Sequence, residues 1–219
     1  MQTTKNTIFL VLFALFFGLN LSAQENSILF DKNGSRWSLG VKGGIDYFFV
    51  NPPAESDTKL KTAVIQASWT GLIFGEYTFN KIFSLGLESG YLAYNRGGSK
   101  GSYAGGTIDA TLYASFNFSN MAKKDILGAS SRVSWYGNIG AGGSYYHYKN
   151  SGKSFKEEGK GFAPLAFAGV TCAVNLTNNW ELFAEAQYRA YIAKNMGGEN
   201  VKAFTNAFAA FLGVRYKIF

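Results

Sequence analysis

The sequence is poor in the residues that build most catalytic and metal sites, since its 219 residues include one cysteine and one histidine. The single cysteine, Cys172, excludes a disulfide framework within the chain. The single histidine, His147, means that any Ser–His–Asp arrangement or histidine-ligated metal would have to use that residue. We therefore predict no catalytic residues, no metal site and no cofactor.

The sequence also lacks blocks of one charge and long apolar runs. Its net charge of +7 comes from scattered basic residues, which argues against binding to nucleic acid. The apolar run at residues 8–19 is shorter than the about 20 residues that a membrane-spanning helix needs. It follows Lys5 and precedes Ala23, so we interpret residues 1–23 as a secretory signal peptide. A short N-terminal lead, 24–35, and one domain, 36–219, complete the predicted organisation.

Aromatic residues make up 17% of the chain and glycines number 26, against three prolines, a composition that favours strands. From residue 36 onward, apolar and polar residues alternate in eight runs. Charged residues within these runs share the polar parity: Lys42, Asp46, Glu76, Glu88, Asp109, Glu181, Glu185, Arg189, Arg215 and Lys217. Eight such runs predict an antiparallel meander that closes on itself.

Alternation alone fits both a transmembrane barrel with lipid on the apolar face and a soluble barrel of lipocalin type. The polar parity consists mainly of Ser, Gly, Thr and Asn, which suits a packed interior. Long connections at 48–62, 95–106, 149–161 and 192–203 alternate with tight ones at 80–82 and 177–179, as in outer-membrane barrels. The long connection at 119–131 departs from this pattern, and we expect a short helix there. We predict an all-β, eight-stranded antiparallel up-and-down transmembrane β-barrel with both termini in the periplasm.

The chain ends on "FLGVRYKIF", which alternates up to the last residues. A strand that closes a barrel pairs with the first strand, so the chain can end there without leaving an open edge. We expect this segment to be the closing strand and to be recognised by the barrel-assembly machinery.

Several segments resemble those of the small outer-membrane β-barrel proteins of Bacteroidetes, which have a porin-like β-barrel domain. They are Gly40, Lys42 and Gly43, "GLIFGEYTFNKIFSLGLESGY" at 71–91, "LSAQ" at 21–24 and "GVRYKIF" at the end. The resemblance covers the mature chain and implies a barrel in the outer membrane, in contact with membrane lipid and lipopolysaccharide. It implies no particular reaction.

The inward charges predict ion pairs in the lumen, because an eight-stranded barrel is filled by side chains and a buried unpaired charge is costly. We expect a lumen salt-bridge network of Lys42, Glu76, Glu88, Glu185 and Arg215, with Arg215 paired to at least one of the three glutamates. A continuous pore is not expected.

Aromatic residues recur where the strands meet the periplasmic end. Such rings favour the membrane–water interface. We therefore predict an aromatic girdle at one level of the barrel, formed by Trp37, Tyr77, Phe83, Phe118, Trp135, Trp180 and Tyr216.

The predicted function is that of a non-enzymatic outer-membrane barrel. Its outer loops would serve surface interaction, envelope integrity or an accessory role in secretion, with a partner protein in the envelope. One alternative is a lipid-A-modifying enzyme using His147, although Lys149 stands two residues later, where enzymes of that kind have their serine. Another alternative is a narrow channel or a carrier for a small ligand.

Overall fold

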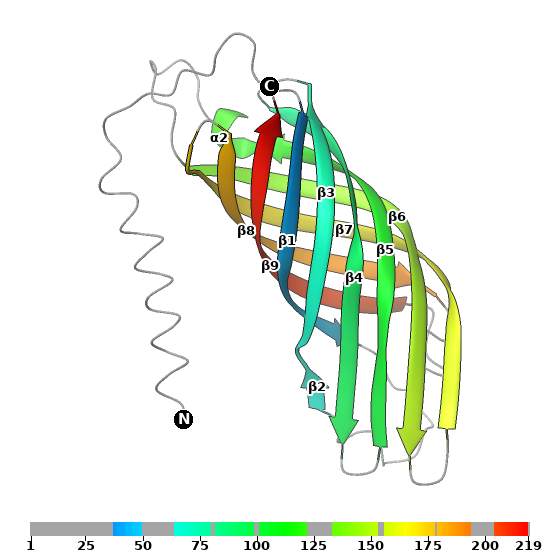
Figure 1. Cartoon of the computed structure of the whole chain (residues 1–219). Coiled ribbons are helices and arrows are strands. Elements are labelled where there is room, and N and C mark those ends of the chain that lie inside the picture. Colours follow the sequence, from blue (N-terminus) through cyan, green and yellow to red (C-terminus); the bar gives the residue numbers. More distant parts are fainter. Residues whose placement is uncertain are drawn as a thin grey trace, which may run out of the picture.

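The computed structural model describes residues 37–49, 64–79, 82–98, 101–121, 133–152, 156–177, 179–193 and 204–218. The predicted signal peptide, 1–23, and the predicted lead, 24–35, lie outside the described residues. The described chain is almost entirely strand (Figure 1). The strands are β1 (Trp37–Phe49), β2 (Val64–Gln66), β3 (Ser68–Thr78), β4 (Phe83–Gly98), β5 (Gly101–Asn117), β6 (Val133–Gly152), β7 (Lys156–Asn175), β8 (Trp180–Ile192) and β9 (Phe204–Ile218), with one helical turn, α2 (Phe118–Met121). No described helix is long and apolar enough to cross a membrane.

The strands close into an antiparallel barrel in which neighbours in sequence are neighbours in space. Only Ala67 separates β2 from β3, and both segments pair with β4, so the two form one barrel strand and the total is eight. Closure occurs between β1 and β9, with Trp37 opposite Ile218. The predicted fold class and the role of the last segment as closing strand are confirmed.

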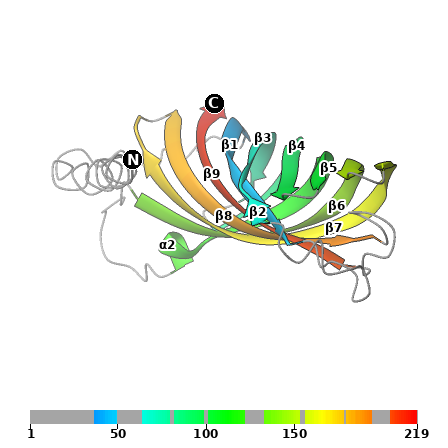
Figure 2. The ribbon, with the colours of Figure 1, turned by 90° about the horizontal axis from the view of Figure 1, so that it is seen from below.

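The stagger of the barrel follows from its register. Stepping from paired residue to paired residue once around the barrel, a path that starts at Trp135 returns to β6 at Tyr145, ten residues further along. Ten residues of stagger over eight strands tilt the strands by about 35–45° from the barrel axis. Figure 2 shows the strong curvature of the resulting sheet.

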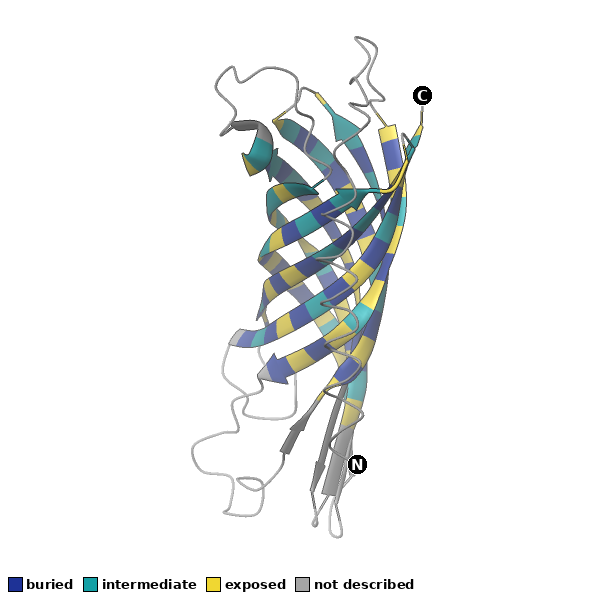
Figure 3. Cartoon of the chain, turned by 90° about the vertical axis from the view of Figure 1, so that its left-hand side faces the viewer, coloured by how far each residue is buried: buried dark blue, intermediate teal, exposed yellow. Residues whose placement is uncertain are grey.

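Burial alternates along the strands wherever it is described, and Figure 3 shows it as bands of buried and exposed residues. In β1, Ser38, Lys42 and Asp46 are buried, whereas Trp37 and Val41 are more than half exposed. The polar parity therefore faces the lumen and the apolar parity faces outward, which excludes the lipocalin arrangement. We call the end where β1 begins and β9 ends proximal, and the opposite end distal.

The two predicted tight turns are confirmed at the proximal end. Phe79 N–H donates to the carbonyl of Phe83, and Leu176 N–H donates to that of Trp180. The connection predicted at 119–131 begins within a helical turn, α2, which already includes Phe118. Residues 122–131 lie outside the described residues.

Two of the four predictions of a long distal loop are wrong, and the other two, 48–62 and 192–203, lie almost entirely outside the described residues. Residues 95–98 and 101–106 belong to β4 and β5, and residues 149–152 and 156–161 belong to β6 and β7. The glycines and polar residues there resembled loop composition, yet the strands continue because each pairs with its neighbour along this length. Strands β4–β7 thus project beyond the rest of the barrel at the distal end, as the long arrows of Figure 1 show. We call this projection the distal wall.

Three inward glycines lie where the backbone of a neighbouring strand comes too close for a Cβ atom. A Cβ on Gly44 would stand 1.9 Å from the carbonyl oxygen of Ala210, one on Gly90 would stand 2.2 Å from that of Gly71, and one on Gly142 would stand 2.0 Å from that of Ala110. No side chain fits at such distances. The register puts these three glycines at nearly the same height, so the three close backbone approaches lie at one level of the barrel.

Candidate functional site

The barrel interior holds two groups of ion pairs. The group near the proximal end, which we call the proximal network, centres on Glu181. Its carboxylate lies 3.0 Å from Arg215 Nη1 and 3.0 Å from Lys217 Nζ. Arg215 Nη2 also lies 3.6 Å from Glu76, which accepts a hydrogen bond of 3.1 Å from the hydroxyl of Tyr113. Two cations thus face two carboxylates.

The second group, the distal network, begins at Lys42. Its ammonium lies 2.6 Å from Glu88 and 2.7 Å from Glu185. Glu88 also pairs with Arg189, whose guanidinium donates a hydrogen bond of 2.8 Å to the carboxylate of Asp109. The network continues through polar side chains: Asn138 and Gln187 donate to Glu185, Arg189 donates to Gln187, and the Tyr191 hydroxyl donates to Asp109.

Aromatic rings lie between the two networks. Phe74, Tyr113, Phe167 and Phe183 form a buried cluster with Ala173, and Tyr136 packs against it. The ring of Phe74 lies 5.9 Å from Lys42 Nζ and 5.6 Å from the Arg215 guanidinium carbon. Such contacts stabilise a cation away from water. This aromatic cluster therefore contacts a cation of each charged group.

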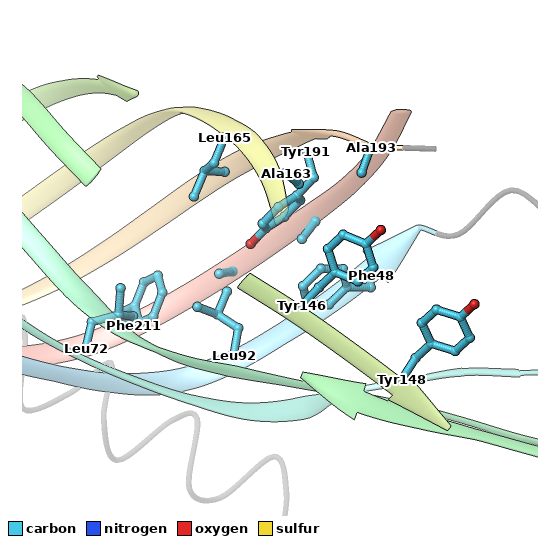
Figure 4. Close-up of a cluster of buried hydrophobic side chains, with 12 residues drawn as sticks. Phe48, Leu72, Leu92, Tyr146, Tyr148, Ala163, Leu165, Tyr191, Ala193 and Phe211 are labelled. Carbon is cyan, nitrogen blue, oxygen red and sulfur yellow. The ribbon is translucent and has the colours of Figure 1, made fainter. Parts of the chain in front are cut away.

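A larger apolar cluster covers the distal network (Figure 4). In that view Phe48, Tyr146 and Tyr191 lie close together, with Leu92 and Phe211 deeper in the barrel. Tyr191 and Leu92 are fully buried. Side chains therefore occupy the lumen from the proximal network to this cluster, an arrangement that does not favour a continuous channel.

The five residues predicted for the lumen all face inward, but they divide between the two networks. Arg215 lies with Glu76, whereas Lys42 lies with Glu88 and Glu185. Of the three glutamates offered as partners of Arg215, the structure brings Glu76 to it and brings Glu88 and Glu185 to Lys42. Four further members were missing from the prediction: Asp109, Glu181, Arg189 and Lys217. Their inward parity was visible in the sequence, and the pairing depends on the stagger, which was not.

The seven predicted girdle residues lie at one end of the barrel. When the stagger is shared equally among the strands, they fall within about two residue positions of one another, or roughly 5 Å along the axis. Trp37 contacts Tyr77 and Trp180 contacts Tyr216, each pair with ring centroids 4.9 Å apart. We call this group the proximal belt.

A second group of outward aromatic residues lies toward the distal end, and sequence reasoning missed it. We call it the distal belt: Tyr47, Trp69, Tyr91, Tyr145, Tyr188 and Phe208. It is separated from the proximal belt by about nine residue positions, or roughly 20 Å along the axis. Exposed aliphatic side chains fill the interval, among them Val41, Ile73, Leu87, Leu112 and Ile139. This spacing approaches the ~25 Å apolar band of membrane barrels.

His147 projects outward from β6 just beyond the distal belt and stacks on Tyr91, with ring centroids 6.2 Å apart. Its partners across the sheet are Gly106 and Lys160 rather than a serine or a carboxylate. Nor do the described residues contain a group of three His, Cys, Asp or Glu side chains placed to hold a metal ion. The observed surroundings of His147 do not support a hydrolytic triad.

Two hollows, of about 720 and 630 Å³, lie on the outer wall rather than in the lumen. Outward apolar side chains border them, including Leu39, Leu87 and Trp180 around the first and Trp135 and Val170 around the second. Both lie between the belts, where acyl chains would fill them. They are features of a lipid-facing surface.

A closed antiparallel barrel with an apolar band between two aromatic belts and a polar interior defines the class of outer-membrane β-barrels. Residues 33–219 match the OmpA-like transmembrane domain family, and the chain belongs to this family. The comparison with curated proteins gave no match.

Solved structures support the fold. Neisserial surface protein A is similar with a TM-score of 0.51 at 16% identity, over 83% of this chain and 97% of that chain. The attachment invasion locus protein Ail of Yersinia pestis gives 0.51 at 14%, over 83% and 97%. A major outer membrane protein from Thermus thermophilus gives 0.51 at 11%, over 82% and 98%. The likeness concerns architecture.

Proposed function

We propose that this chain is a non-enzymatic outer-membrane barrel whose distal wall contacts the phosphate groups of lipopolysaccharide and so supports envelope integrity. The observation that carries the proposal is a small cluster of basic side chains on the outward face of β6 and β7, immediately beyond the distal belt. Lys149 is 63% exposed, Lys160 is exposed, and Lys160 lies opposite His147 across the sheet. Headgroup phosphates would lie at this height.

The local electrostatics suit this role. Lys149 Nζ lies 2.8 Å from Glu158, and hydrogen bonding to this carboxylate raises the pKa of Lys149. The lysine therefore stays protonated at neutral pH. Because the ion pair is exposed, it holds Lys149 only weakly and a phosphate can displace Glu158. A lysine ammonium is a common ligand for phosphate.

The orientation follows from the same proposal. The distal end would face outward, because its wall carries the basic cluster, and the proximal end with its tight turns would face the periplasm. The filled lumen supports a structural and contact role over transport. The Yersinia pestis neighbour is by its name an attachment protein, and a surface contact function is consistent with a wall that extends beyond the other strands of the barrel.

The proposal is tested by refolding the protein into phospholipid vesicles with and without lipopolysaccharide and measuring its thermal unfolding by heat-modifiable gel migration. We expect lipopolysaccharide to raise the unfolding temperature of the wild type. The double variant Lys149→Gln, Lys160→Gln should lose most of this increase. The matched control Glu158→Gln removes a neighbouring charge without removing a cation and should keep the increase.

An equal response of the double variant and the wild type would contradict the proposal. Mass spectrometry of the lipid A after incubation with the protein tests the enzymatic alternative. Lipid A that is modified by the wild type but not by His147→Ala would show that the barrel is an enzyme. We expect unmodified lipid A from both the wild type and His147→Ala.

A further inference from the structure

The charges of the distal network do not balance. Among the described side chains, two cations face four carboxylates in this part of the lumen: Lys42 and Arg189 against Asp46, Glu88, Asp109 and Glu185. The proximal network, by contrast, has two of each. The excess of negative charge in the interior is therefore confined to the distal half. Uncompensated charge is expensive in a desolvated interior.

Asp46 is the carboxylate that the network leaves out. It is fully buried, and neither of its carboxylate oxygens has a hydrogen-bond partner among the described residues. Its neighbours across the sheet, Ser68 and Ala209, are small, and so is Gly44 two residues earlier. The cross-strand neighbours of this carboxylate are therefore short, and neither is a lysine or an arginine.

Other buried oxygens at the same height also lack partners. Asp109 uses one carboxylate oxygen for Arg189 and Tyr191, while its Oδ1 has none. Ser144, opposite Asp109 on β6, is fully buried and its Oγ has no partner either. The register places Asp46, Asp109 and Ser144 within about two residue positions of one another along the axis. The unpartnered side-chain atoms of these three residues are all oxygens.

We propose that the distal lumen binds one hydrated divalent cation of the hard class, Ca²⁺ or Mg²⁺, with Asp46 as its charged protein ligand. Oxygen donors are the ligands that these ions prefer. A divalent ion offsets both excess charges, whereas one proton on Asp46 offsets one and leaves the other. The waters of the ion supply donors for Asp109 Oδ1 and Ser144 Oγ. This site is independent of the proposed lipopolysaccharide contact.

The site has few carboxylates, so binding is expected to be weak. Ions held by few charged ligands in extracellular modules dissociate at about 10⁻⁴–10⁻³ M. Outer-membrane proteins meet such concentrations outside the cell. The apolar cluster around Phe48 and Tyr146 covers the site, so the ion should be present while the barrel folds and should exchange slowly afterwards.

The test uses the full mature chain refolded in detergent micelles without lipopolysaccharide, in EDTA, NaCl, MgCl₂ or CaCl₂ at matched ionic strength. For the wild type we expect saturable stabilisation by a divalent ion at millimolar concentration, with the unfolding temperature about 5 °C higher than in EDTA. Asp46→Asn keeps the shape of the side chain and removes its charge. It should be more stable than the wild type in EDTA and should not respond to Mg²⁺ or Ca²⁺.

Ser144→Ala is a second, milder variant. It should still be stabilised by the divalent ion, but with a higher half-saturating ion concentration than the wild type. Glu158→Gln removes a carboxylate from the exposed wall and should respond like the wild type. Direct binding is measured by equilibrium dialysis with radioactive Ca²⁺, where we expect one ion per wild-type chain and none for Asp46→Asn. A wild type that gains stability only on acidification, with no dependence on a divalent ion, would overturn the proposal in favour of a protonated Asp46. An equal response of Asp46→Asn would overturn it as well.

Discussion

The two halves of the lumen contain the same kinds of residue but differ in how their charges are matched. In the proximal half, Arg215 and Lys217 share Glu181, and the network ends near the barrel mouth, where Lys217 is 20% exposed. In the distal half, Lys42 is almost fully buried and serves two carboxylates. A matched network near water tolerates change, whereas a deeper network with surplus negative charge depends on each of its cations.

The largest expected effect is that of Lys42→Met. The change leaves Glu88 with one cation and Glu185 with none, in a region already rich in carboxylates. Removing one partner of a buried ion pair costs about 3–5 kcal/mol of the free energy of unfolding. Urea unfolding in detergent micelles measures this loss. Adding Glu185→Gln should recover part of the lost free energy of unfolding. A Lys42→Met variant with the same free energy of unfolding as the wild type would show that the distal ion pairs do not stabilise the barrel.

The next largest loss of stability is expected from alanine at Gly44, one of the glycines close to a neighbouring backbone, and Gly71 provides the matched control. A methyl group on Gly44 would meet the Ala210 carbonyl oxygen at 1.9 Å, whereas one on Gly71 would meet nothing within 4 Å. Forcing atoms into packed structure costs about 1–3 kcal/mol. We expect Gly44→Ala to lower the urea midpoint and Gly71→Ala to leave it unchanged. Equal midpoints for the two variants would mean that the strand can straighten at this position.

Lys217→Met should have a smaller effect than Lys42→Met. Glu181 keeps Arg215 as its partner, and the lysine is partly exposed to water. The expected loss is about 1 kcal/mol or less, close to that of an exposed ion pair. The difference between the two lysine variants, measured in one series of urea titrations, is the direct test of the contrast between the halves.

The smallest effect on stability is expected from changes in the belts, where the measurement is depth. Variants with one tryptophan each, at Trp180 or at Trp69, should show weak fluorescence quenching by bromines near the middle of the acyl chains and strong quenching by bromines near the headgroups. The belts are roughly 20 Å apart along the axis, so the two residues report opposite interfaces. Strong mid-chain quenching of Trp180 would contradict the proximal belt.

Alternation in the sequence was enough to predict the barrel, its closing strand and the direction in which the charged side chains of the eight runs point. Lys42 and Arg215 both face the lumen for that reason. Their partners were harder to predict, because the offset between neighbouring strands is decided by turns and by packing across the lumen. A difference of two residues in that offset moves a lysine from one carboxylate to another.

The distal wall shows a different limit. Glycine, serine and lysine between residues 95 and 106 are typical of loops, and the sequence alone favours a loop there. In the structure, Tyr94 lies opposite Gly105 and Tyr103 lies opposite Arg96, in a ladder that continues from the barrel. Pairing with an existing strand overrides local composition, because a strand extended from a rigid template costs less entropy than one formed alone.

The ten-residue stagger also limits how the chain can change in length. A residue inserted into a single strand would reverse the facing of every side chain beyond it, so that buried charges would turn toward lipid. Shifting the whole strand by one position does not restore the facing. Because the barrel is closed, the strand must keep the same inward and outward alternation as both of its neighbours. Within the strands, insertions and deletions are therefore expected in pairs, or as a bulge that ejects the extra residue. The distal tips, where β4 turns into β5 and β6 into β7, carry no such condition, and there the chain can lengthen by any number.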